Sequence, residues 1–307
     1  MFCGGTRHTR LGPALALVFA LVLAATAPAE EPGKAGGEDV RAEAASPEKK
    51  SDNQEKADAR KYTVRPGTAK TFEKARQHLD AQQYAEAKAE LDELRLNRLT
   101  PYERALAHRL YGYVVYGMEE NDAAIEHLQQ AIAEEEGLPP REQADVLFQI
   151  AQIQAAEGRW KDVVATLESW FRIAEQPNSS AYYLLAMSHY QLEDFDAALA
   201  PARQAVEIAR VPQQAWLQLL LSIHLTRQDY ASAKAVLDQM VALYPNSSKD
   251  YWIQLSTLHG VMGDDPRALA VLEIAHRKGI LTEERYLRRM LQMMLARGVP
   301  FRAALIF

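Results

Sequence analysis

LAMSHYQLEDFDAA (residues 185–198), LLSIHLTRQDYASA (220–233) and LSTLHGVMGDDPRA (255–268) are three copies of one pattern. Each copy begins with leucine, has histidine at its fifth position and ends in alanine, and successive copies lie 35 residues apart. A fixed period of this length and content is typical of paired helices that stack into a solenoid. The stretch therefore predicts an all-α fold built from repeated helix hairpins.

The same pattern continues in both directions along the chain. When the copies are aligned on their final small residue, seven copies follow one another at steps of 35 to 39 residues. A small residue usually lies twelve positions before this alignment residue, and a large apolar residue usually lies four positions after it. Small side chains let two crossing helices approach, and large neighbours fill the grooves beside the crossing. The alignment residues are Ala87, Ala124, Val163, Ala198, Ala233, Ala268 and Ala304.

Composition limits the classes of function that the chain can have. The 307 residues have a formal net charge of −6, which argues against nucleic-acid binding because no basic stripe is present to replace phosphate counterions. The single cysteine, Cys3, excludes a cysteine-rich zinc site and a disulfide framework. The fold is therefore expected to be stable through packing alone.

Residues 1–29 have the composition of a secretory signal peptide. Arg7 and Arg10 precede an apolar run over residues 11–25, and cleavage sites with small residues end at Ala27 and Ala29. The alternative is an uncleaved membrane anchor, but the run is shorter than the ~20 residues that a spanning helix needs. We expect a periplasmic protein after cleavage, or a membrane-anchored one if the segment is retained.

Residues 30–68 are expected to be a disordered linker. The segment contains prolines, glycines and mixed charges but almost no large apolar side chains. Such a segment cannot bury enough surface to offset the entropy lost on ordering. It is either a functional tether or a solvated tail without a role.

Through the recurring small, aromatic and large apolar residues of its aligned copies, the chain resembles the tetratricopeptide repeat (TPR) family, in degenerate form, over residues 70–307. The resemblance implies a right-handed α-solenoid of stacked TPR hairpins over residues 69–307, with six full repeats and a partial seventh. The chain ends in Ala304-Leu305-Ile306-Phe307 without a polar capping helix, although solenoids need one. We therefore expect either that the chain is truncated or that this end is buried against something else.

A narrower resemblance covers residues 240–307. The runs YWIQL (251–255), AHRKGILT (275–282) and VPFRAA (299–304) are similar to the periplasmic TPR component of bacterial TonB-type energy-transduction systems. The resemblance implies partners of the ExbB/ExbD/TonB type in the inner membrane or periplasm.

Four histidines share one place in their repeats, nine residues before the alignment residue. A metal-binding column is one interpretation, but side chains on successive repeats are too far apart to converge on one zinc ion. Packing is the other, and we favour it because the family pattern has tyrosine at this place. We predict no metal site at His78, His189, His224 and His259.

No motif in the sequence predicts catalysis. Glu134, Glu135 and Glu136 lie in a turn after the second repeat, where a solvated turn explains them better than a pair of acids across a cleft. Nucleophile-elbow, phosphate-loop and dinucleotide-binding patterns are not found in the sequence. The chain is therefore expected to be a non-enzyme without a cofactor or small-molecule substrate.

The predicted working surface is the concave face lined by the first helix of each hairpin. Residues that share this face at helical spacing include aromatic, methionine and glutamine side chains, which suit a protein or peptide partner. The alternative is that several of the tyrosines pack between repeats. None of these residues is asparagine, which the family's carboxylate clamp for chaperone C-termini requires. The predicted protein-binding groove consists of Arg109, Tyr113, Tyr116, Phe148, Gln152, Tyr183, Met187, Tyr190, Gln218, Ser222, Ile253 and Thr257.

The sequence thus predicts an exported protein-binding scaffold, with a TonB/ExbB/ExbD-type complex as the partner that the narrower resemblance implies. Two alternatives stay open. One is the helical scaffold part of a larger envelope polysaccharide exporter or cell-wall enzyme, and the other is an outer-membrane assembly scaffold. The missing lipidation cysteine after the apolar run weighs against the latter.

Overall fold

The structure is a computed structural model that describes residues 61–244 and 249–298. The chain divides into two units, residues 1–63 and 64–307. In the first unit only residues 61–63 are described, and the ammonium group of Lys61 lies 5.5 Å from the ring centroid of Tyr62. The predicted signal peptide, most of the predicted linker and the chain end after residue 298 lie outside the described residues.

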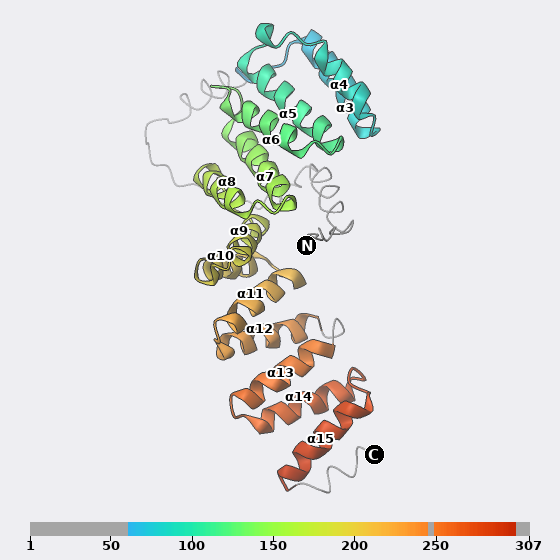
Figure 1. The fold of residues 1–307 in the computed structure, drawn as a ribbon, viewed down its shortest axis with the longest axis vertical. Helices are drawn as coiled ribbons and strands as arrows, with labels where there is room; N and C mark the ends of the chain where they lie inside the picture. The colour runs from blue at the N-terminus through green and yellow to red at the C-terminus, as the bar shows by residue number, and fades with distance from the viewer. Residues whose placement is uncertain (1–60, 245–248, 299–307) are drawn as a thin grey trace, which may run out of the picture. The chain divides into compact units, whose positions relative to one another are not determined.

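The second unit is built from helices, and no strand occurs in its described part (Figure 1). This confirms the predicted all-α fold. The α-helices are α3 (Pro66–Asp80), α4 (Tyr84–Asp92), α5 (Pro101–Gly117), α6 (Asn121–Ala133), α7 (Pro140–Ala156), α8 (Trp160–Ile173), α9 (Ser179–Gln191), α10 (Phe195–Ile208), α11 (Gln214–Thr226), α12 (Tyr230–Leu243), α13 (Lys249–Val261), α14 (Asp265–Arg277) and α15 (Glu284–Ala296). A short 3₁₀ helix, η2 (Leu96–Arg98), follows α4.

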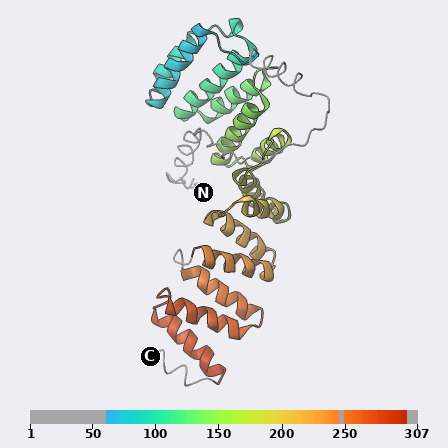
Figure 2. The same cartoon turned by 180° about the vertical axis from the view of Figure 1, so that it is seen from behind.

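Each helix packs against the next one along the chain, from α3 to α15 (Figures 1 and 2). The helices pair as hairpins from α3/α4 to α13/α14, and α15 follows the last pair. The first helices of neighbouring repeats also meet, as α3 with α5 and α9 with α11. This is the stacked arrangement of a TPR solenoid, so the predicted fold class is confirmed.

The second helix of every described hairpin begins three residues before the alignment residue. These first residues are Tyr84, Asn121, Trp160, Phe195, Tyr230 and Asp265. The alignment residues themselves are at most 1% exposed, from Ala87 through Ala268. Repeat spacing in the sequence therefore marks both the start of each second helix and the point where it is buried.

The helix crossings are as close as the small residues suggested. A Cβ atom added to Gly112 of α5 would lie 2.8 Å from Cγ of the buried Leu128 on α6. In the sixth hairpin the hydroxyl of Ser256 donates to the carbonyl oxygen of Ala268, with the two oxygens 2.9 Å apart. Both small residues lie twelve positions before their alignment residue, so this position touches the crossing directly.

The turn inside each hairpin has a left-handed residue five positions before the alignment residue. Glycine, which adopts this conformation without steric cost, occupies it only at Gly158 and Gly263. The other four repeats place a residue with a side chain there. These residues are Gln82, Glu119, Glu193 and Gln228, with φ between 58° and 65°.

An ion pair anchors the start of the first hairpin. The backbone N–H of Arg65 donates to Oε1 of Glu103, and its Nε lies 2.9 Å from Oε2. The Glu103 side chain is fully buried and also closes a capping box with Thr100 at the start of α5. The linker was predicted to extend to residue 68, but α3 begins at Pro66, because this anchor fixes the chain three residues earlier than expected.

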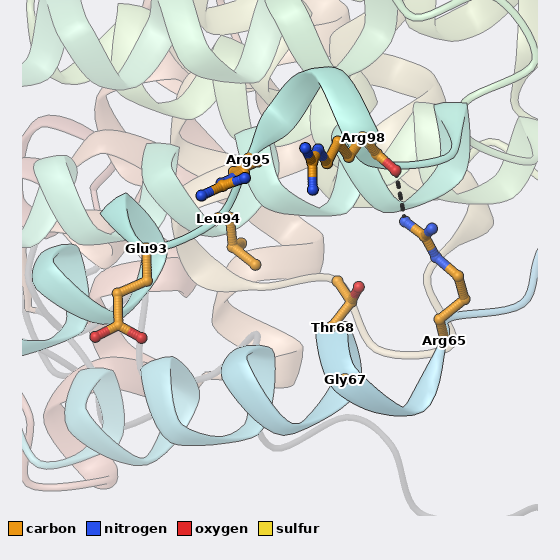
Figure 3. A pocket seen from close by; sticks show the side chains of 7 residues that line it. All are labelled: Arg65, Gly67, Thr68, Glu93, Leu94, Arg95 and Arg98. Carbon is orange, nitrogen blue, oxygen red and sulfur yellow. Dashed lines mark hydrogen bonds between the residues drawn. The ribbon is translucent and has the colours of Figure 1, made fainter.

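A cavity opens beside this anchor (Figure 3). The Nη2 atom of Arg65 donates to the carbonyl oxygen of Arg98 at 2.8 Å, which Figure 3 draws as a dashed line. None of the predicted groove residues borders the cavity. Its lining residues are Arg65, Gly67, Thr68, Glu93, Leu94, Arg95 and Arg98.

The Glu103 carboxylate makes stability depend on pH. Burial alone would raise the pKa of Glu103, but hydrogen bonds from Arg65, Thr100 and Thr68 outweigh burial and lower the pKa to about 2. The folded pKa lies below the unfolded value, so this contribution is present above about pH 5 and is lost as pH falls toward about 2. We expect Glu103→Gln to lower the free energy of unfolding at neutral pH by about 2 kcal/mol, measured by urea unfolding.

The same variant should also flatten the loss of stability below about pH 5. Glu168→Gln on α8, where the glutamate is exposed, is the control and should change neither quantity measurably. Equal pH profiles for wild type and Glu103→Gln would contradict this role of the ion pair.

Candidate protein-binding face

The predicted groove residues all lie on first helices, from α5 to α13. They occupy the same register in each repeat, mainly fifteen and eleven positions before the alignment residue. None of them is fully buried. Gln218 and Thr257 are exposed, and the other ten are half-buried. We call the surface formed by these twelve residues the candidate face.

Side chains connect neighbouring first helices across the α5–α7 part of the candidate face. Nη1 of Arg109 lies 2.9 Å from Oε2 of Glu142, and the hydroxyl of Tyr113 donates to Oε1 of Gln149 at 2.6 Å. The Arg109 guanidinium also lies 6.0 Å from the ring centroid of Tyr113. Burial raises the pKa of Tyr113, while the Arg109 charge acts in the opposite direction. The charge of Arg109 is thus balanced by Glu142 of the next first helix, which borders the candidate face.

Aromatic contacts connect the α9–α11 part. The ring centroids of Tyr183 and Trp216 are 6.2 Å apart, and Tyr190 meets Phe195 edge to face at 5.4 Å. Tyr183, Met187 and Tyr190 pack against the hydrophobic core while keeping part of their surface open. Each therefore serves the packing of the repeats and still offers surface to a partner.

A tyrosine joins α11 to α13. The side-chain amides of Gln214 and Gln218 both donate to the hydroxyl oxygen of Tyr251, the first with N and O 2.9 Å apart. Tyr251 is 7% exposed, so this link lies just beneath the face. Sequence reasoning missed Tyr251, Glu142 and Gln149, because their roles depend on the register between repeats rather than on the pattern within one.

The four recurring histidines are spread between core and surface. His224 and His259 are buried, whereas His78 and His189 are half-buried. Nδ1 of His224 lies 3.1 Å from Oδ2 of Asp229, and burial lowers the pKa of His224 while Asp229 raises it. Within residues 61–244 and 249–298, no group of three or more histidine, cysteine, aspartate or glutamate residues could hold a metal ion.

None of the helices in the described part of the chain is long and apolar enough to cross a membrane.

Comparison with known proteins identifies the repeats. Sequence models of the tetratricopeptide repeat match residues 179–212 and 213–247, which contain α9/α10 and α11/α12. Tetratricopeptide repeats are therefore present in this chain, as the repeat pattern predicted. No curated protein matches the chain in sequence.

Two solved structures share the fold. The C-terminal part of a TPR repeat-containing protein from Cytophaga hutchinsonii matches with a TM-score of 0.54 at 15% identity, covering 77% of this chain and 92% of that chain. A tetratricopeptide repeat protein from Parabacteroides merdae matches with a TM-score of 0.50 at 14% identity, covering 78% of this chain and 90% of that chain. Likeness at this identity supports the solenoid fold alone, and the narrower resemblance to TonB-type systems stays a prediction.

The Tyr251 link gives a test of how the face is held together. Tyr251→Phe removes the acceptor of two amides, and we expect the free energy of unfolding to fall by about 1–2 kcal/mol. Tyr182→Phe on α9 is the matched control, since no hydrogen bond of the Tyr182 hydroxyl occurs among the described residues. Urea unfolding followed by circular dichroism measures both, and equal effects of the two variants would show that the link does not hold α11 to α13.

Proposed function

We propose that the chain is a protein-binding scaffold whose candidate face holds a segment of another protein. One observation carries the proposal: half-buried or exposed side chains occupy one register over five successive first helices, and aromatic, methionine or glutamine side chains are among them on α5, α7, α9 and α11. Aromatic and methionine side chains are enriched at protein interfaces, where a few of them supply most of the binding energy. On this proposal the chain acts by binding rather than by catalysis.

The face is held in shape before a partner arrives. The Arg109–Glu142 ion pair and the Tyr251 link connect neighbouring repeats. A preorganised surface loses less conformational freedom on binding, so more of the contact energy appears as affinity. This favours recognition of a segment that itself becomes ordered on the face.

The finer proposal is that this scaffold is exported and serves a TonB/ExbB/ExbD-type system of the inner membrane or periplasm. Two features of the sequence support it. Residues 1–29 have the order of charged, apolar and small residues of a signal peptide, and residues 251–255 and 275–282 resemble the TPR component of such systems. Periplasmic location after cleavage is part of the same proposal.

Capture from cells tests the proposal. The tagged full chain is crosslinked in cells that express an ExbB/ExbD/TonB-type system, and bound proteins are identified by mass spectrometry. We expect components of that system to be recovered. The double variant Tyr113→Ala/Tyr183→Ala should reduce recovery about tenfold or more, since truncation of aromatic interface residues commonly costs at least ~1–2 kcal/mol each.

The control is Ile208→Ala/Leu243→Ala, which truncates two exposed apolar residues on second helices. It should leave recovery unchanged. Recovery of other proteins in place of that system would contradict the finer proposal. Capture that survives the double tyrosine variant would show that the candidate face is not the binding surface.

A further inference from the structure

Three neighbouring first helices contain no charged side chain over most of their length. No lysine, arginine, aspartate or glutamate occurs in α9 (179–191), in α11 (214–226) or in residues 251–261 of α13. A quarter of all residues in the chain are charged. The charges of these repeats lie instead on the second helices and turns, for example at Asp196 and Arg203 on α10.

Burial explains only part of this pattern. Core positions such as Leu217 and Ile223 have to be apolar, but several positions on these helices are open to solvent. Exposed positions of second helices in the same solenoid are freely charged, as Lys161 and Glu168 of α8 show. The exposed but uncharged residues of the three first helices include Gln191, Gln218, Thr226, Gln254 and Thr257. Folding does not require uncharged residues at these exposed positions. Their lack of charge therefore indicates a role in binding.

The uncharged surface is rich in groups that can recognise a peptide backbone. The hydroxyl oxygen of Tyr251 accepts from Gln214 and Gln218, and its own proton has no acceptor among the described residues. Tyr251 is 7% exposed, so its hydroxyl orients these two amides from beneath the face rather than contacting a partner itself. Exposed amides such as those of Gln218 and Gln254 can donate and accept, as a peptide backbone requires.

A charged segment would be disfavoured here. Binding removes water from a charged side chain, and no opposite charge in α9, α11 or residues 251–261 of α13 compensates for that loss. The α5–α7 part differs, because its charged groups Arg109 and Glu142 neutralise each other. Discrimination against a charged partner segment is therefore expected at α9, α11 and α13 rather than at α5 and α7.

We propose that α9, α11 and α13 bind an extended, uncharged peptide segment of a partner protein, with apolar side chains against Tyr183, Met187 and Ile253. The inference rests on the proposed function and names the chemistry of its partner. Packed helices lie about 8–10 Å apart, so three first helices span about 20 Å. An extended chain rises about 3.3 Å per residue, and a segment of about six residues therefore covers them.

Peptide selection tests the inference with the full chain. A library of random peptides of about twelve residues is displayed on phage and selected against the immobilised chain. We expect enriched peptides to contain an uncharged block of about six residues with apolar side chains. Affinity of the synthetic peptides, measured by fluorescence polarisation, should change less than about twofold between roughly 50 and roughly 500 mM NaCl, because no charge pair is screened. A lysine or aspartate placed in the block should weaken binding about tenfold or more.

Two variants sharpen the test. Thr257→Lys adds a charge to the exposed surface of α13 and should shift the enriched peptides toward acidic residues in the block. Ala200→Lys adds the same charge at an exposed position of the second helix α10 and should leave the selection unchanged.

The outcomes separate this inference from the proposed function. If enriched peptides are charged or salt-sensitive but lose binding with Tyr183→Ala/Met187→Ala, the inference is wrong and the protein-binding face survives. Failure to enrich any peptide, or binding that the same double variant leaves intact, would overturn both.

Discussion

The structure depends on one packing constraint, the close crossing of two helices at a small side chain. The six alignment residues from Ala87 to Ala268 are at most 1% exposed, and five of them are alanine. At the second crossing a single added methyl on Gly112 would already press on Leu128. Close crossings leave no room for larger groups, because protein interiors are packed as densely as organic crystals.

This constraint also determines where the candidate face lies. A fixed crossing sets the rotation of the first helix in each hairpin, so residues eleven and fifteen positions before the alignment residue turn to one side in every repeat. Contacts between repeats then tie residues at these positions to the next first helix, as Arg109 to Glu142 and Gln218 to Tyr251. A repeated local rule thereby places these positions on one side, and the absence of charge on α9, α11 and residues 251–261 of α13 gives part of that surface a distinct chemistry.

Much of the fold could be predicted from the sequence, because the crossing imposes residue types that recur. The alignment residues marked the buried point of each second helix, and the residue three positions earlier marked its start. The left-handed turn residue could not be predicted in the same way. Glu193 occupies a position where glycine would be the usual signal, because the fixed crossing imposes the turn geometry even on residues with side chains.

Contacts between residues far apart in the sequence could not be predicted from the repeat pattern either. The early start of α3 depends on the pairing of Arg65 with Glu103, although the run Thr100-Pro101-Tyr102-Glu103 could have been recognised as a capping box. The placement of the groove residues on first helices followed from helical spacing, whereas the link through Tyr251 required the register between repeats. The charge-free stretches of α9, α11 and α13 were visible in the sequence, and the repeat spacing already assigned them to successive first helices. The contacts of α9 with α11 and of Gln218 with Tyr251 required the structure.

The central claim is that buried small residues at the crossings hold the repeats, and substitution of two alanines on α12 tests it most directly. Ala233 is buried at the crossing, whereas Ala235 is exposed one half-turn later on the same helix. Urea unfolding of Ala233→Leu should show a loss of about 1–3 kcal/mol, because the larger side chain forces the helices apart. Ala235→Leu should stay within about 0.5 kcal/mol of the wild type. Equal stability of the two variants would contradict the account.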